Sequence, residues 1–182
     1  MPSLTTAVVL PGRGYPVDGP LLFFAQVALR RRGVDVTALR WSPPPDLDAA
    51  GAPGWVASQL EPVLAAGGRP LVVAKSLGSF AAPVVAERGL PAIWLTPLLG
   101  QETVVAALRA ARAPALLVGG TADPAWDGTV ARSLGMAVHE VPGGDHALLL
   151  PGPLAASAEA LGGVATAMEQ FLDSIGAPAP AG

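Results

Sequence analysis

The sequence predicts an α/β protein, a three-layer α/β/α sandwich with about six mostly parallel strands. Short apolar runs bounded by Gly and Pro alternate with longer segments of helical period, the order that a parallel sheet with crossover helices requires. Several runs consist almost wholly of Val, Leu, Ile and Ala, as strands buried on both faces should. The 182 residues are 51% hydrophobic, enough for one sizeable core, so we expect a single domain over residues 1–175.

The expected strands are the short apolar runs themselves. They cover residues 5–10, 35–39, 71–75, 92–95, 115–119 and 137–141.

Helices are expected between these runs. In the first of them, Leu21, Leu22, Ala25 and Leu29 share one face, and Gly33 supplies a C-terminal stop. Further helices fit residues 54–66, 79–88, 101–109, 126–134 and 154–175.

Two segments contain few residues that a core would bury. Residues 43–48 hold three consecutive prolines and two aspartates, which indicates a stiff surface loop. Residues 176–182 are Gly, Ala and Pro alone, so we expect a disordered C-terminal tail.

The charge pattern argues against a nucleic-acid partner. The formal net charge is −3, and the longest run of like charge is Arg30 to Arg32, at the end of a predicted helix, where cations are favourable. Binding through phosphate contacts would need a basic stripe.

The residue inventory narrows the chemistry further. The chain has no cysteine, which excludes disulfides, thiolate metal sites and a cysteine nucleophile. The first apolar run, residues 7–10, is too short for a signal peptide or a membrane span, so we expect a cytoplasmic protein that does not contact a membrane. Heavy use of Ala, Gly, Pro, Val and Leu with a single lysine is typical of a GC-rich bacterial genome.

A serine stands where one predicted strand turns into a helix. Ser76 follows the run 71–75 directly, with Ala74 two positions before it and Gly78 two positions after it. A strand that turns at once into a helix strains the turning residue and needs small neighbours at these positions. The stretch therefore fits a nucleophile elbow, although a serine N-cap for the helix would also account for Ser76 alone.

An aspartate and a histidine follow later strands. Asp123 comes just after the fifth predicted strand, and His146 lies in the loop after the sixth. Because parallel strands end at a common edge of the sheet, both side chains can meet Ser76 there. The chain order Ser, Asp, His is that of one class of serine hydrolases and differs from the chymotrypsin and subtilisin orders.

With these motifs, the chain resembles the small members of the α/β-hydrolase superfamily that lack a cap domain, over residues 5–175. The resemblance implies a sheet without the first two antiparallel strands of larger relatives. It also implies that residues 96–113, where larger relatives insert a lid, hold only a loop and a helix, so that the site is open. The stretches that carry it are residues 10–14 (LPGRG), 74–79 (AKSLGS), 119–124 (GGTADP) and 143–146 (GGDH).

The resemblance further implies an oxyanion hole made of two backbone N–H groups. Leu77, after the nucleophile, is one candidate, and Arg13, between Gly12 and Gly14, is the best candidate for the other. Pro11 and Gly12 replace the His-Gly that is usual in this loop, which removes a side chain but no required amide.

Several aromatic residues fall near the same sheet edge. Trp41, at the end of the second predicted strand, and Trp126, after Asp123, either line a substrate pocket or pack ordinarily. Tyr15 and Asp18, after the first strand, have the same alternatives. We include Gly12, Gly14, Tyr15, Trp41 and Trp126 among the candidate substrate-binding residues.

Other titratable residues compete for the catalytic roles. His139 lies within a predicted strand, and Asp127 lies within the helix after Asp123, so we favour His146 and Asp123. Asp145 is expected to point elsewhere. Lys75 precedes Ser76, but neighbours at a strand end project to opposite sides, which favours a binding or structural role over that of a base.

These residues predict a serine hydrolase that cleaves a small carboxylic ester or thioester through a Ser76-His146-Asp123 triad. The alternatives are an acyltransferase or other tailoring enzyme of bacterial metabolism that uses the same triad, and a non-catalytic binding protein. We expect no cofactor and no metal, a small acyl substrate, and a monomer or a homodimer.

Overall fold

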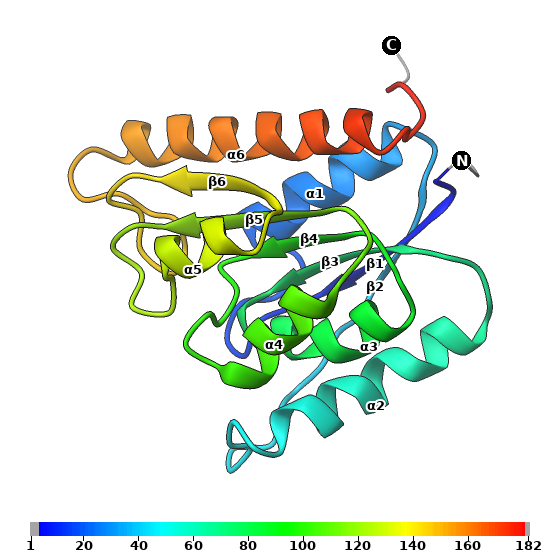
Figure 1. Ribbon diagram of the computed structural model, residues 1–182. Coiled ribbons are helices and arrows are strands. Elements are labelled where there is room, and N and C mark those ends of the chain that lie inside the picture. Colours follow the sequence, from blue (N-terminus) through cyan, green and yellow to red (C-terminus); the bar gives the residue numbers. More distant parts are fainter. Residues whose placement is uncertain (1–3, 181–182) are drawn as a thin grey trace.

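The computed structural model describes residues 4–180, in which six parallel strands form one sheet (Figure 1). The strands lie in the order β2-β1-β3-β4-β5-β6, and every neighbouring pair is parallel. The expected α/β class is thereby confirmed. The strands are β1 (Thr6–Leu10), β2 (Asp35–Ala38), β3 (Leu71–Lys75), β4 (Ala92–Leu95), β5 (Ala115–Gly120) and β6 (Ala137–Val141).

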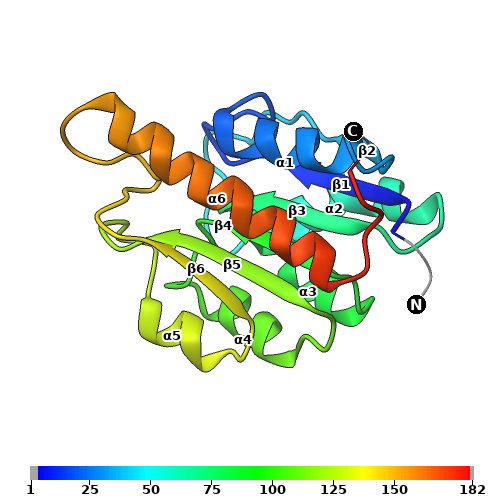
Figure 2. The ribbon, with the colours of Figure 1, turned by 90° about the horizontal axis from the view of Figure 1, so that it is seen from above.

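Helices cover both faces of this sheet. In Figures 1 and 2, α1 and α6 lie on one face, and α2, α3 and α4 lie on the other. No inserted cap interrupts the series of elements between residues 4 and 180. The helices are α1 (Pro20–Arg30), α2 (Ala52–Ala65), the 3₁₀ helix η1 (Ser76–Ala81), α3 (Ala82–Glu87), α4 (Glu102–Ala110), α5 (Gly128–Ser133) and α6 (Leu154–Ser174).

Most helix boundaries lie within one or two residues of those expected, and two of the differences have a clear local cause. Residues 79–88 were expected to form one α-helix, but the chain leaves β3 through the tighter η1 before α3 begins. The helix expected over 126–134 begins later, because the Asp127 carboxylate accepts the N–H groups of Thr129 and Val130 and so caps α5.

Alternate residues of each central strand enter opposite layers of the core. In β1, Val8 and Leu10 pack with α2 and α3, whereas Ala7 and Val9 pack with α1 and α6. β3 repeats this alternation and is buried throughout. Continuous apolar runs therefore mark strands that have a helix layer on each side.

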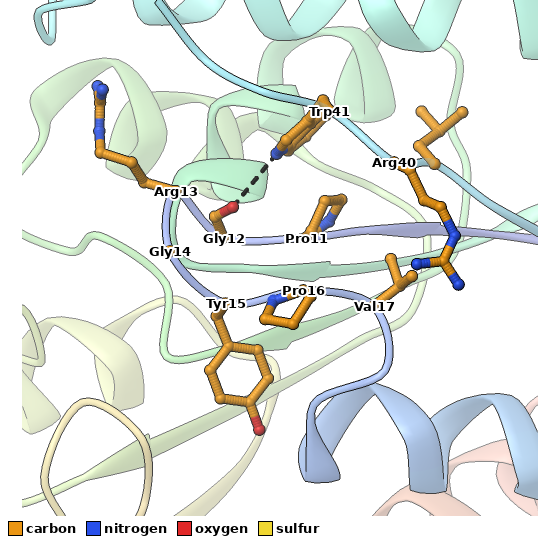
Figure 3. Close-up of a pocket in the computed structure, with 10 residues that line it drawn as sticks. Pro11, Gly12, Arg13, Gly14, Tyr15, Pro16, Val17, Arg40 and Trp41 are labelled. Atoms are coloured by element: carbon orange, nitrogen blue, oxygen red, sulfur yellow. Dashed lines mark hydrogen bonds between the residues drawn. The ribbon is translucent and has the colours of Figure 1, made fainter. Parts of the chain in front are cut away.

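The chain reverses its direction across the sheet between β1 and β3. From β1 it passes to β2 on one side, and it then returns to add β3 to β6 on the other. Such a switch point leaves a crevice at the carboxyl ends of the two strands. The loop after β1 borders this crevice, and the Trp41 indole N–H donates to the Gly12 carbonyl at 3.2 Å from the loop after β2 (Figure 3).

A buried arginine joins the C-terminal ends of α1 and α6. Arg32 is 5% exposed and donates to Asp173 at 2.6 Å and to the Pro178 carbonyl at 3.0 Å. Of the arginine run, Arg30 occupies the last turn of α1 as expected, whereas Arg32 instead joins two helices.

The disorder expected for residues 176–182 stays a prediction. Ala177 packs against the core layer of α1 and α6 and donates its N–H to the Leu172 carbonyl. Residues 181 and 182 lie outside the described part. In residues 4–180 no helix combines the length and the apolar character that a membrane span needs.

Gly120, at the end of β5, offers a test of how tightly this edge is packed. A Cβ at Gly120 would lie 2.0 Å from the Gly144 carbonyl oxygen, in the loop that follows β6. We expect Gly120→Ala to lower the free energy of unfolding by about 1–3 kcal/mol, as overpacking does. Urea denaturation measures the change.

Gly162, in the middle of α6, provides the matched control, since a Cβ there meets no atom within 4 Å apart from its chain neighbours and the backbone of its own helix. Gly162→Ala should raise the free energy of unfolding by about 0.5–1 kcal/mol through helix propensity. Equal midpoints for the two variants would mean that the β5 end does not depend on this contact.

Candidate active site

Ser76 stands at a sharp turn between β3 and η1. Its φ angle is +50°, a left-handed conformation that costs a non-glycine residue about 1–2 kcal/mol. The preceding residue, Lys75, is still extended, with φ −114° and ψ 135°. The turn therefore lifts the serine hydroxyl out of the strand direction at the carboxyl edge, as the nucleophile-elbow interpretation requires.

Small residues around the turn permit this close passage. A Cβ at Gly78 would lie 3.0 Å from the Cβ of Leu10 and 3.2 Å from the Cβ of Ala74. These distances leave room for a methyl group on one side of the turn but not on both. Alanine is therefore tolerated at position 74, where glycine is usual, because position 78 is glycine.

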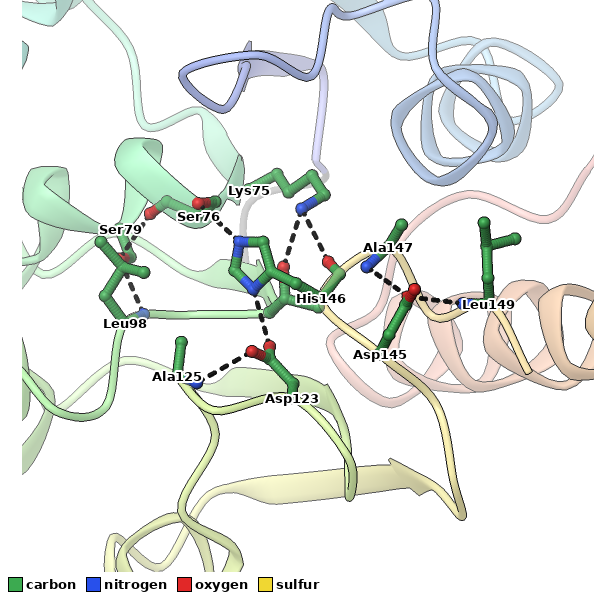
Figure 4. A network of polar contacts seen from close by, with 11 residues as sticks. Lys75, Ser76, Ser79, Leu98, Asp123, Ala125, Asp145, His146, Ala147 and Leu149 are labelled. Carbon is green, nitrogen blue, oxygen red and sulfur yellow. Dashed lines mark hydrogen bonds and ion pairs between the residues drawn. The ribbon is translucent and has the colours of Figure 1, made fainter. Parts of the chain in front are cut away.

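Ser76, His146 and Asp123 form a continuous chain of hydrogen bonds (Figure 4). The Ser76 Oγ lies 2.8 Å from His146 Nε2, and His146 Nδ1 lies 2.7 Å from Asp123 Oδ2. An ionised carboxylate only accepts hydrogen bonds, so Nδ1 carries the imidazole proton and donates to Asp123. Nε2 is then free to accept the serine proton.

The chain of hydrogen bonds runs from the interior to the surface. The Asp123 side chain is 1% exposed and the His146 side chain is 40% exposed. The second carboxylate oxygen of Asp123 accepts the N–H of Ala125 at 2.8 Å, which fixes the carboxylate. The imidazole thus has a rigid partner on one side and solvent access on the other.

The loops that carry Asp123 and His146 are hydrogen-bonded to each other. The Ala122 N–H donates to the Gly144 carbonyl at 3.0 Å, and the Gly143 N–H donates to the Thr121 hydroxyl at 2.8 Å. Gly143 has a φ of +73°. The glycines before His146 therefore allow the close approach that sets the distance between acid and base.

The competing titratable residues have other partners. Asp127 caps α5, and His139 lies within β6 beside Gly163 in α6. Asp145 accepts the N–H groups of Ala147 and Leu149, which shapes the loop that holds His146. Residues 4–180 contain no cluster of three His, Cys, Asp or Glu side chains placed to hold a metal ion.

The loop after β1 passes directly beside the serine. A Cβ at Gly12 would lie 3.5 Å from the Ser76 Cβ. The Arg13 guanidinium donates to the carbonyls of Pro44 and Leu47, which anchors this loop to the proline-containing loop. The Arg13 and Leu77 amides remain the predicted oxyanion donors, because both belong to segments that adjoin Ser76.

The candidate substrate-binding residues separate into two groups. Gly12, Gly14, Tyr15 and Trp41 line a cavity of about 240 Å³ between the loops after β1 and β2 (Figure 3). Trp126 lies apart from this cavity: its ring covers Gly119, and its indole N–H donates to Glu140 at 2.9 Å. The geometry gives Trp126 a packing role, and its substrate contact stays a prediction.

Lys75 forms a buried polar link that the sequence did not reveal. Its ammonium donates to the Thr96 hydroxyl and to the His146 carbonyl, each at 3.0 Å, and lies 4.6 Å from the centre of the Tyr15 ring. Burial lowers the pKa of Lys75 to about 8, against the opposing attraction of the Asp123 and Asp145 carboxylates. As expected, Lys75 bonds away from the serine hydroxyl.

Two hydroxyls also support the site without a signal in the sequence. Ser79 is fully buried, donates to the Ser76 carbonyl at 2.7 Å and accepts the Leu98 N–H at 3.2 Å. The hydroxyl of Thr96, a residue with φ +44°, accepts the hydrogen bond from the Lys75 ammonium. The Ser79 to Ser76 bond is local, but the contacts with Thr96 and Leu98 depend on β4 lying beside β3, so motif spacing alone could not find those two.

Solved structures share this architecture. Est1E from Butyrivibrio proteoclasticus with bound ferulic acid matches at a TM-score of 0.71 and 16% identity, over 94% of this chain and 89% of that one. A lid-less serine hydrolase, XC6422 from Xanthomonas campestris, matches at 0.63 and 16%, over 96% and 85%. Mouse alpha/beta hydrolase domain-containing protein 10 matches at 0.65 and 12%, over 93% and 90%.

No protein-family model and no curated protein sequence matches the chain. At these identities the structural likeness establishes the fold. The chain therefore has the α/β-hydrolase fold in its lid-less form, and the resemblance noted in the sequence is confirmed at that level.

The buried Lys75 predicts a pH dependence of stability. Between pH 8 and 10.5 the unfolded chain keeps the lysine proton and the folded chain loses it. The free energy of unfolding contributed by Lys75 should therefore rise across this window and be lost as the pH falls through 8. The measurement is urea denaturation of wild type and Lys75→Met from pH 7 to 10.5.

The difference between the two chains is the informative quantity, because Tyr15, whose pKa burial raises, titrates in both. A wild-type minus Lys75→Met difference that stays flat with pH would contradict the prediction.

The positive φ of Ser76 predicts an unusual response to glycine. Ser76→Gly relieves the left-handed strain and should be about 0.5–1 kcal/mol more stable than Ser76→Ala, net of the greater freedom of unfolded glycine. At Ser58, inside α2, the same comparison should give the opposite sign, since glycine lowers helix propensity. Thermal or urea unfolding of the four variants decides the matter.

Proposed function

We propose that this chain is a serine hydrolase that cleaves a small carboxylic ester or thioester. Ser76 is the nucleophile, His146 the general base, and Asp123 the carboxylate that orients the imidazole. The observation that supports this most directly is the unbroken hydrogen-bond chain from a strained serine to a buried aspartate.

In the first half of the reaction the Ser76 oxygen attacks the acyl carbonyl carbon while its proton passes to His146 Nε2. The negative charge that develops on the carbonyl oxygen is stabilised by the backbone N–H groups of Leu77 and Arg13. When the tetrahedral intermediate collapses, the bond to the leaving oxygen or sulfur breaks, and His146 returns the proton to it. The acyl group remains on Ser76.

In the second half water replaces the leaving group. Its oxygen attacks the acyl-enzyme, one of its protons passes to His146, and the Ser76 oxygen leaves and regains a proton. The exposure of the His146 side chain, 40%, gives water a route to this position. That openness favours hydrolysis over acyl transfer, which requires water to be excluded.

The names of two solved structures with this fold also support an ester substrate. Besides Est1E with ferulic acid, an esterase domain from Rhodothermus marinus shares the fold, with a TM-score of 0.59. Their names support an ester as the substrate class for this chain.

Labelling with a fluorophosphonate probe tests the proposal. We expect one adduct, mapped to Ser76 by mass spectrometry, and none in Ser76→Ala. His146→Ala should label and hydrolyse p-nitrophenyl acetate on the order of 10⁴-fold more slowly or worse, because the serine then lacks its base. A folded wild type that neither labels nor turns over would support the binding-protein alternative instead.

The chain provides matched controls. His139 is the other histidine of the sequence and lies in β6, and Ser58 lies on the exposed part of α2. His139→Gln and Ser58→Ala should label and hydrolyse as the wild type does. Thermal unfolding of Ser76→Ala, followed by circular dichroism, should have the same midpoint as the wild type. The serine N-cap alternative predicts a lower midpoint for this variant.

A further inference from the structure

An apolar cavity of about 310 Å³ lies beside the catalytic residues, on the face of the sheet covered by α1 and α6. It opens between the start of α1, the loop after His146 and the first half of α6. The side chains that line it are mainly aliphatic. They include Tyr15, Leu21, Leu148, Leu149, Leu154 and Leu161.

Two of its walls continue directly into the active site. One wall is the segment 147–149, which follows His146 without a break. The other is Tyr15, whose own loop brings Gly12 beside Ser76 and whose ring faces the Lys75 ammonium. Figure 3 shows the Tyr15 side chain directed away from Trp41, and its hydroxyl accepts the Leu21 N–H at the start of α1.

The cavity lies on the histidine side of the serine. In Figure 4 the residues run in the order Ser76, His146, Ala147 and Leu149. In the proposed reaction His146 gives its proton to the leaving oxygen, so the leaving alcohol must be on this side of the acyl carbon. An apolar leaving group thus has a place to bind, and the acyl group points elsewhere.

The rim of the cavity exposes apolar side chains to solvent. Leu154 is 77% exposed and Leu149 is 51% exposed, although most leucines of the chain are buried. The backbone of Leu148, between the catalytic histidine and this rim, has a φ of +61°. Exposed leucines around an apolar hollow, beside a strained catalytic loop, are typical of a binding site for an apolar ligand.

We propose that this cavity binds the alkyl chain of the alcohol part of the ester substrate, so that the preferred substrates are esters of unbranched aliphatic alcohols with small acyl groups. The proposal rests on the hydrolase function proposed above. Since a water molecule occupies about 30 Å³ of liquid, the cavity has room for on the order of ten non-hydrogen atoms.

Two substrate series test the assignment. In the first, acetate is esterified with ethanol, butanol, hexanol or octanol; in the second, ethanol is esterified with butyric, hexanoic or octanoic acid. Acid release in a pH-stat gives kcat/KM, which reports acylation. Across the acetates kcat/KM should rise up to about fourfold per CH₂, the equivalent of about 0.8 kcal/mol, until the cavity is full. Across the ethyl esters it should not rise.

A variant that fills the cavity connects the trend to these residues. Ala158 and Ala155 are both exposed on α6, but only Ala158 lines the cavity. Ala158→Trp should lower the ratio of kcat/KM for hexyl acetate to that for ethyl acetate at least about tenfold. Ala155→Trp should leave this ratio unchanged.

The outcomes separate this inference from the function on which it rests. If Ser76 labels and ethyl acetate turns over but the acetate series is flat, or if the ethyl-ester series rises instead, the alcohol-site assignment is overturned and the hydrolase function stands. If no ester turns over and Ser76 does not label, the hydrolase function itself fails.

Discussion

The left-handed turn at Ser76 is the constraint on which the rest of the site depends. A single non-glycine residue with φ +50° joins β3 to η1, and it is stable only because the neighbouring backbone can come very close. Gly78 supplies that space against Leu10, and Ser79 holds the strained carbonyl of Ser76 by a hydrogen bond. The sheet therefore fixes the direction of one hydroxyl to which the other loops are fitted.

The loops that meet this hydroxyl are rigid because they hold one another. The segment after β5 and the segment after β6 share backbone hydrogen bonds, and Gly120 leaves no room between them. In addition, the Lys75 ammonium donates a hydrogen bond to the backbone carbonyl of His146. The imidazole is thus positioned from its own backbone as well as through Asp123, which in the proposed reaction limits the rearrangement needed during proton transfer.

Local sequence predicted those features that local chemistry determines. Strands buried on both faces show as continuous apolar runs, and an elbow shows as a serine between small residues, so the sheet, Ser76, Asp123 and His146 were placed from the sequence alone. The features that the sequence did not predict depend on residues that are distant in the chain. Arg32 was expected to serve the end of α1, yet Asp173, 141 positions away, determines its place. The Lys75 link and the apolar cavity likewise need elements that only the strand order brings together.

The pairing of α1 with α6 bears on how the chain is made. These two helices share one face of the sheet, and the two residues of the Arg32 to Asp173 contact between them are 141 positions apart in the chain. The apolar residues of β1 and α1 that pack against α6 are therefore synthesised long before the helix that covers them. Contacts between residues this distant in sequence form slowly, because the chain must first lose the entropy of closing the loop between them. A chain that lacks α6 would leave the apolar residues of this layer exposed, and exposed apolar surface of this kind favours aggregation.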